Sequence, residues 1–296
     1  MPRRCDRNRT NATRWAASAA PLLLAGCSEP GLLDPAGPVA AGEKAMFFNA
    51  LVIMGAIIVP IIVLTLYFAW RYSAKNPRGQ YTPEWTYSGR LELLVWSVPA
   101  LVIIFLGGIA WIGSHELDPA RPIASRVKPV RVEVISLDWK WLFIYPEQGV
   151  ATINRLVIPA GTPIAFRITS GTVMNSFMVP RLGSQIYAMA GMDAKLHLLA
   201  DRPGRYRGLS AHYSGEGFSK MAFFADAVSP EQFAGWVART KRAGPILDGP
   251  AYLALSRQAA TAKPSSYRAV VPGLYDAAVR QSGVKVAETA RNGRED

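Results

Sequence analysis

The chain has 296 residues, half of them hydrophobic, and its mean hydropathy of +0.12 is high for a soluble protein. Its formal net charge is +12, but five arginines and Asp6 within residues 1–26 contribute +4, which leaves +8 for the rest. Basic residues are scattered along that remainder, and it carries no nucleic-acid-binding motif. Composition therefore favours membrane segments and argues against a nucleic-acid partner.

The first 26 residues are organised like an export signal. An arginine-rich start is followed by a short apolar stretch from Trp15 to Leu24, and small residues stand directly before Cys27. This pattern resembles bacterial lipoprotein signals, which implies cleavage before Cys27 and its lipidation, palmitate included. An ordinary free or buried cysteine is the alternative. Because the other cysteine, Cys5, lies in the signal, we expect the exported part to be stable without disulfides.

Two long apolar segments follow a short tail at residues 27–44. They cover about residues 46–70 and 91–112, and each has the roughly 20 residues needed to cross a bilayer. Pro60 lies inside the first segment, where a membrane helix tolerates it. The sequence therefore predicts a transmembrane hairpin over residues 45–113, with buried core helices as the alternative.

The loop between the two segments indicates their orientation. It carries four basic residues against Glu84 alone, namely Arg71, Lys75, Arg78 and Arg90. Short loops rich in lysine and arginine stay in the cytoplasm. Both chain termini are therefore predicted to be periplasmic, in agreement with a lipidated Cys27 on the outer side of a bacterial inner membrane.

Residues 125–228 change to short alternating runs separated by turns. Residues 130–135 alternate with period two, and Pro-Gly and Ser-Gly pairs supply turns, as in a β-sandwich or barrel. Ser229, Pro230 and Gln232 then form the pattern of a helix start with a capping box. We expect a peripheral helical and irregular region over residues 229–283 and a disordered tail over 284–296.

Two motifs in the β-rich region have the spacing of a copper site without its ligands. Residues 173–180 read VMNSFMVP, in the frame V-x-H-S-F-x-V-P, and residues 210–221 fit C-x3-C-x3-H-x2-M. The ligand positions hold Asn175, Ser210, Ser214 and Phe218, and Met221 is retained. A copper pair needs bridging thiolates and imidazoles, which these side chains do not supply. We predict that the chain binds no metal.

These frames resemble subunit II of the haem-copper respiratory oxidases. The version without ligands is similar to the ubiquinol-oxidising branch, of the cytochrome bo or ba type. The resemblance implies a membrane-anchored chain with a cupredoxin-like Greek-key sandwich after the hairpin. It further implies a complex in which ubiquinol gives electrons to haems and one copper in subunit I, which reduces oxygen to water. Smaller subunits III and IV would be further partners, and cytochrome c would not.

Glu92 is the sharpest candidate for a role in turnover. It stands at the cytoplasmic start of the second span, where an ionisable group is costly unless it faces water, a partner or a proton path. Residues 90–99 resemble the family segment whose glutamate marks where protons enter subunit I. The alternative is a glutamate that complements the dipole of its own helix.

Four aromatic residues in one run, Trp139, Trp141, Phe143 and Tyr145, are the second candidate set. In copper-bearing relatives the matching aromatics lie between electron donor and metal. Without copper, we predict a structural role, in which they pack the sandwich onto subunit I. His212 with Met221, Met189 and Met192 is a weak copper(I) pattern, and the methionines are better explained as core residues.

Two other classes of protein share part of this pattern. A cytochrome c oxidase subunit would need cysteine at positions 210 and 214 and histidine at 175 and 218, and the sequence lacks all four. A stand-alone membrane lipoprotein with a copper-free cupredoxin module, used for binding or assembly, stays open. No hydrolase or nucleotide-binding motif is present.

Overall fold

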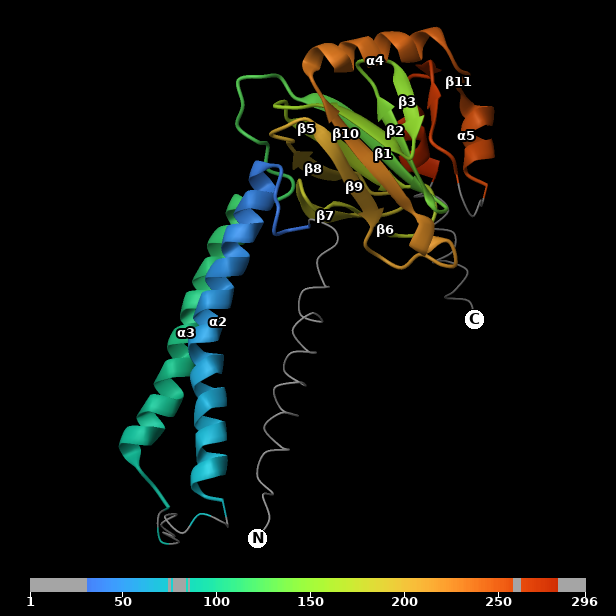
Figure 1. Cartoon of the computed structure of the whole chain (residues 1–296). Helices are drawn as coiled ribbons and strands as arrows, with labels where there is room; N and C mark the ends of the chain where they lie inside the picture. Colours follow the sequence, from blue (N-terminus) through green and yellow to red (C-terminus); the bar gives the residue numbers. More distant parts are fainter. Residues whose placement is uncertain (1–30, 74–75, 77–83, 85, 258–261, 282–296) are drawn as a thin grey trace, which may run out of the picture.

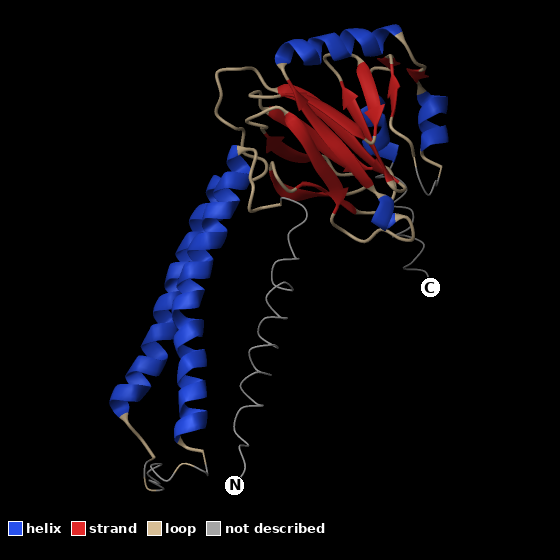
Figure 2. Cartoon of the chain, in the orientation of Figure 1, coloured by secondary structure: helices blue, strands red, loops and turns tan. Residues whose placement is uncertain are grey.

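The computed structural model describes residues 31–73, 76, 84, 86–257 and 262–281 (Figure 1). The predicted signal, the lipidation site Cys27 and the tail at 284–296 lie outside these residues. Within them, two long helices run side by side away from a β-sandwich that carries further helices (Figures 1 and 2).

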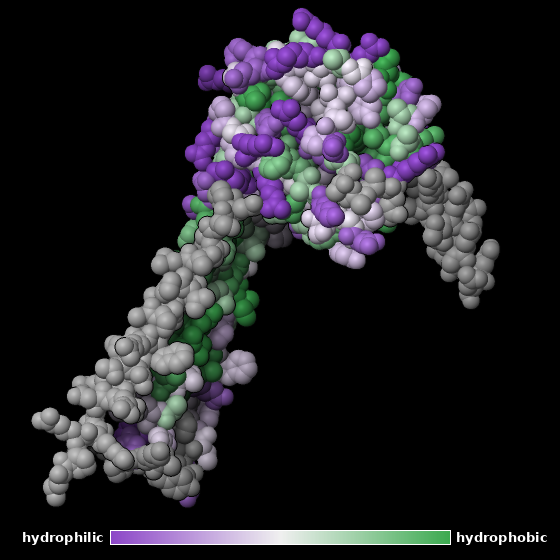
Figure 3. Space-filling model, turned by 45° about the vertical axis from the view of Figure 1, so that its right-hand side comes forward, coloured by the Kyte–Doolittle hydropathy of each residue, from purple (hydrophilic) through white to green (hydrophobic). Residues whose placement is uncertain are grey.

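The two helices are α2 (Pro38–Arg71) and α3 (Gly89–Glu116), and both are long and apolar enough to cross a membrane. Figure 3 shows hydrophobic surface along these helices, while hydrophilic residues gather on the sandwich. Pro60 lies inside α2 without ending it. These observations fit the predicted hairpin and a membrane-anchored chain.

Helix α2 begins well before the predicted start near residue 46. Pro38 occupies the first helical turn, where its missing N–H costs nothing. The amide of Ala36 donates to the carbonyl of Arg181 over 2.7 Å, and Ala40 is fully buried. Packing against the sandwich thus makes the end of the predicted tail helical, a contact that hydropathy does not reveal.

The sandwich consists of a six-stranded and a five-stranded sheet, with strand orders β12-β3-β2-β1-β5-β8 and β4-β10-β9-β6-β7. Neighbouring strands are antiparallel except β1 with β5 and β4 with β10. The strands before the C-terminal region are β1 (Val130–Leu137), β2 (Lys140–Tyr145), β3 (Val150–Ile153), β4 (Arg155–Pro159), β5 (Ile164–Ser170), β6 (Asn175–Val179), β7 (Gly183–Ala188), β8 (Ala194–Leu198), β9 (Gly204–Ser210) and β10 (Ala222–Val228).

Aromatic rings fill the space between the two sheets, with Phe177 at the centre. Its ring centroid lies 5.3 Å from that of Trp141 and 5.2 Å from that of Phe223. Trp141, Phe143 and Tyr145 are all 0% exposed. The prediction that these three aromatics face subunit I is therefore wrong, because their side chains are enclosed by their own domain.

The C-terminal region was predicted to be peripheral, but it packs on the sandwich at two places. Its first helix packs against the core between the sheets through Phe233 and Trp236, and the segment after this helix covers the outer face of the six-stranded sheet. The region contains α4 (Pro230–Arg242), β11 (Ile246–Leu247), α5 (Gly249–Leu255), β12 (Ser265–Tyr267) and β13 (Ala269–Val270). The predicted capping box at Ser229 and Gln232 is confirmed. Strand β12 pairs with β3, and Tyr252, Tyr267 and Tyr275 join a second core on this face. This cover explains why all six residues of β2 are buried.

Polar contacts hold the region in place. Lys140 is 3% exposed, and its ammonium donates to the carbonyls of Leu255 and Arg257 over 2.8 and 2.9 Å at the end of α5. Burial lowers the pKa of Lys140. The Asn154 amide donates to the carbonyl of Ala262 over 2.9 Å. The side chains of Lys140 and Asn154 thus provide hydrogen-bond donors for backbone carbonyls that the short segments of the C-terminal region leave without partners.

A charge cluster at the edge of the same face makes stability depend on pH. The Arg167 guanidinium lies 3.3, 2.9 and 3.0 Å from carboxylates of Glu133, Asp193 and Asp276. Burial raises the pKa of Glu133, Arg167 opposes the shift, and the two aspartates add to it. The folded chain thus holds this proton more tightly than the unfolded chain, so the stability tied to it is lost as pH rises through the raised pKa.

We predict that Glu133→Gln raises the thermal unfolding midpoint at pH 7 to 8, because it removes the cost of ionising a desolvated carboxyl. The gain should shrink towards pH 4, where Glu133 itself becomes protonated. Unfolding of the purified chain in mild detergent between pH 4 and 8 measures this. Arg167→Gln is the matched control and should lower the midpoint at neutral pH. A Glu133→Gln midpoint below that of the parent chain at pH 8 would contradict the prediction.

Candidate functional site

The two substituted motifs meet where β6 and β9 run side by side. Phe177 and Ser210 are register partners, which brings Asn175, at the start of β6, beside Ser210. The Ser210 hydroxyl donates to the Asn175 amide oxygen over 3.2 Å, and the Asn175 amide nitrogen donates to the carbonyl of Val173 over 3.2 Å. Asn175 and Ser210 are 1% and 4% exposed. At two ligand positions, buried polar groups therefore bond to protein atoms.

The other positions lie in the loop after β9 and in a 3-10 helix at Phe218–Lys220. The buried Ser214 hydroxyl has no hydrogen-bond partner among the described residues. The half-buried Phe218 packs edge-on against Tyr213, with ring centroids 5.7 Å apart. Met221 is 2% exposed, and its carbonyl accepts from the amide of Ser210 over 3.1 Å. The retained methionine is thus a core residue.

Trp139 has a role that the sequence did not reveal. It lies in the turn between β1 and β2 with φ of +58°, a strained value for a bulky residue. Its indole donates to the carbonyl of Ser214 over 3.1 Å. The ring covers Gly217 so closely that a Cβ there would lie 2.2 Å away. Gly217 is the sequence feature that could have indicated this contact, because only a residue without a Cβ fits beneath the ring. Trp139 thus anchors the substituted loop through Ser214 and Gly217.

The donor chemistry of this loop does not fit a copper pair. An amide, two hydroxyls and a phenyl ring replace the expected imidazoles and thiolates, and a thioether alone cannot bridge two ions. His212 is half-buried and faces the ring of Tyr187 at 6.0 Å. Across the part of the chain that the structure describes, no group of three or more histidine, cysteine, aspartate or glutamate side chains could hold a metal ion.

Glu92 lies far from this loop. It occupies the first turn of α3, and its side chain is exposed in the isolated chain. At 1.5 Å per residue, roughly 36 Å of helix separates it from Glu116 at the sandwich end. The structure therefore does not join the two candidate sites, and anything Glu92 does takes place at the other end of the hairpin.

Two membrane-length helices followed by this sandwich define a class of protein, that of the oxidase subunits II. The family model described as "Cytochrome C oxidase subunit II, periplasmic domain" matches residues 131–228.

The chain is 49% identical to ubiquinol oxidase subunit 2 of Acetobacter aceti over 269 residues, which cover 90% of this chain and 87% of the relative. It is 47% identical to cytochrome bo(3) ubiquinol oxidase subunit 2 of Pseudomonas aeruginosa over 264 residues, covering 89% and 80%. Quinol oxidase subunit 2 of Bacillus cereus is 37% identical over 228 residues, covering 76% and 78%. The chain belongs to the family of ubiquinol oxidase subunit 2.

Proposed function

We propose that this chain is the subunit II of a proton-pumping complex that oxidises ubiquinol and reduces oxygen to water. The observation that carries the proposal is the pair Asn175 and Ser210, which stand at two ligand positions and bond to each other. Without thiolates and imidazoles the sandwich offers no electron acceptor to a soluble cytochrome c. Electrons from a membrane quinol instead pass to haems and one copper in subunit I.

The chain's own role is then structural. The hairpin anchors it beside subunit I and the smaller subunits III and IV, and the sandwich covers the periplasmic face of subunit I. A lipidated Cys27, supported by the pattern of residues 1–27, adds a second anchor on the periplasmic side. The basic loop between α2 and α3 supports periplasmic termini.

Purification of the chain with its partners in mild detergent tests the proposal. We expect haem and one copper per complex, and oxygen uptake driven by ubiquinol but not by reduced cytochrome c. Three coppers with cytochrome c activity would contradict the proposal. A chain that purifies without haem or partners would instead support a stand-alone lipoprotein. Mass spectrometry of the N-terminal peptide tests lipidation of Cys27 separately.

We also propose that Glu92 helps protons to enter subunit I. Loss of one negative charge near an aqueous opening changes the local free energy of a proton by about 1 kcal/mol, so Glu92→Gln should slow turnover about fivefold. Assembly and haem content should stay normal. The measurement is ubiquinol-driven oxygen uptake together with proton release by the reconstituted complex.

Glu84→Gln is the matched control, since Glu84 lies in the loop that leads into α3. It should leave turnover within experimental error. Equal rates for the parent complex and Glu92→Gln would assign Glu92 to stabilising its own helix, because a glutamate in a first turn complements the dipole.

A further inference from the structure

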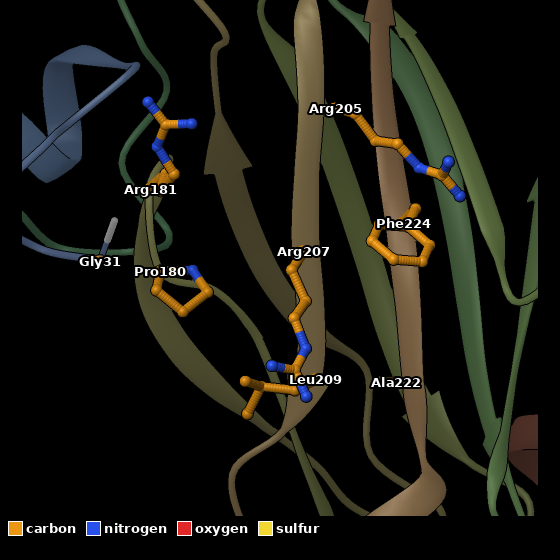
Figure 4. Close-up of a pocket in the computed structure, with 8 residues that line it drawn as sticks. All are labelled: Gly31, Pro180, Arg181, Arg205, Arg207, Leu209, Ala222 and Phe224. Carbon is orange, nitrogen blue, oxygen red and sulfur yellow. The ribbon is translucent and has the colours of Figure 1, made fainter. Parts of the chain in front are cut away.

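A basic groove lies on the outward face of the five-stranded sheet, and its lining residues Leu209 and Ala222 directly flank the substituted loop. Its volume is about 700 Å³. Figure 4 shows the arginines of β9 beside Phe224 of β10, with Arg181 and Gly31 at the opposite rim. The described residues that line it are Gly31, Pro180, Arg181, Arg205, Arg207, Leu209, Ala222 and Phe224.

The period-two geometry of the strands builds this groove. Arg205, Arg207 and Leu209 alternate along β9 with the inward-facing Tyr206 and Gly208. The Arg205 guanidinium lies over the ring of Phe224, 3.8 Å from its centroid. The same guanidinium lies 3.6 Å from the carboxylate of Asp226. The result is a groove with apolar lining residues and three arginines.

The chain's own N-terminal segment already supplies a carboxylate to this rim. Asp34 forms an ion pair with Arg181, and its other oxygen lies 3.2 Å from Arg202. Arg181 also donates through Nε to the carbonyl of Asp34 over 3.0 Å. The segment is thus held to the sandwich by carboxylate-to-arginine contacts before α2 begins.

The next carboxylate upstream is Glu29. Gly31, the first described residue, lines the groove, and residues 27–30 read CSEP. Glu29 stands two residues before Gly31, and two residues of chain span at most about 7 Å, so the groove is within its reach. An arginine guanidinium matches a carboxylate in shape and charge and binds it through parallel hydrogen bonds.

We propose that the groove binds the segment Cys27–Pro30, with the Glu29 carboxylate accepting hydrogen bonds from the arginines of β9. Chain length alone keeps residue 27 within about 14 Å of Gly31. Binding of Glu29 in the groove would in addition fix the position of residue 27 relative to the start of α2, so that a lipid on Cys27 and α2 enter the membrane at a defined spacing. The inference does not depend on the identity of the electron donor, and it stands whether or not Cys27 carries lipid.

Zero-length cross-linking in the full-length chain, in its native membranes, tests the proposal. The variant Arg207→Lys is treated with a water-soluble carbodiimide. The reagent activates a carboxylate, and a neighbouring lysine amine displaces the urea by-product, so an amide forms with net loss of water. We expect an amide between Glu29 and the new lysine in the peptide map, and at least a tenfold lower yield when Glu29→Gln is added.

Two matched variants serve as controls. Arg202→Lys should link to Asp34, whose carboxylate faces that position. Arg131→Lys, on the other sheet, should link to Glu147 and not to Glu29, since Arg131 lies 3.9 Å from the Glu147 carboxylate. Both controls show that the reagent reports proximity.

Three results would overturn the proposal. One is the absence of a Glu29 cross-link from Arg207→Lys while Arg202→Lys links to Asp34. Another is a cross-link from the groove to a carboxylate of another subunit, which would assign the groove to a partner. The third is loss of copurified phosphatidylglycerol from Arg205→Gln and Arg207→Gln but not from Glu29→Gln, which would assign it to a lipid headgroup.

Discussion

Replacement of Phe177 by alanine is expected to lower the free energy of unfolding by about 3–5 kcal/mol, the range for loss of a buried phenyl ring. Phe177 is fully buried, and its ring meets those of Trp141, Phe166 and Phe223 at centroid distances of 5.3, 5.5 and 5.2 Å. The three neighbouring rings cannot move into the cavity that Phe177→Ala would leave, because each of them already packs against other side chains. Since whole domains are stable by about 5–15 kcal/mol, the variant should accumulate poorly.

Urea unfolding of the purified chain in mild detergent, followed by tryptophan fluorescence, measures this change. Tyr213→Ala is the control, because Tyr213 is 72% exposed and its loss should change stability by less than about 0.5 kcal/mol. Phe177→Leu should fall between the two, since it leaves a smaller cavity. A Phe177→Ala chain as stable as Tyr213→Ala would contradict the assignment of this ring to the centre of the core.

Restoring the four lost ligands is expected to create a copper centre. The combined variant Asn175→His, Ser210→Cys, Ser214→Cys and Phe218→His supplies two thiolates and two imidazoles beside Met221, and we expect about two copper ions per chain. The backbone favours this result, because Ser210 and Asn175 already lie in contact and the carbonyl of Met221 bonds to Ser210. Metal analysis and the visible absorption of copper thiolate measure it.

The three-substitution variant that keeps Ser214 is the control for this experiment, since it lacks the second of the two bridging thiolates that the copper pair needs. It should show no binuclear spectrum, and the parent chain should show none either. Equal copper in the four-substitution variant and this control would mean that the loop has lost the geometry as well as the ligands. In the four-substitution variant, a chelator should remove the copper and the copper-thiolate absorption together.

Much of the architecture was predictable because it depends on local patterns. Apolar runs of membrane length indicate spans wherever they occur, and both helices include the predicted ranges, although α2 begins at Pro38, well before the predicted start near residue 46. The capping box at Ser229 uses atoms only three residues apart, so it could be predicted in full. The alternation in residues 130–135 likewise follows from strand geometry alone.

The places where prediction failed all depend on contacts between distant residues. Trp141, Phe143 and Tyr145 were predicted to face a partner because aromatic runs occur at both interfaces and cores. Whether such a run lies in an interface or in a core depends on whether a second layer of the same domain covers the strand. Here the five-stranded sheet covers one side of β2, and the C-terminal region covers the other. A composition rich in proline, glycine and charge concealed that second cover.

The sequence by itself determined the chemistry that this protein lacks. Whether a side chain is a thiolate, an imidazole or an amide is a property of the residue, so the absence of a copper ligand set at positions 175, 210, 214 and 218 needed no coordinates. Only the tertiary structure decided what those positions do instead, because the bond between Asn175 and Ser210 joins two strands 35 residues apart. The groove that we assign to Glu29 exists for the same physical reason, since β9, β10 and the N-terminal segment meet only in the folded chain.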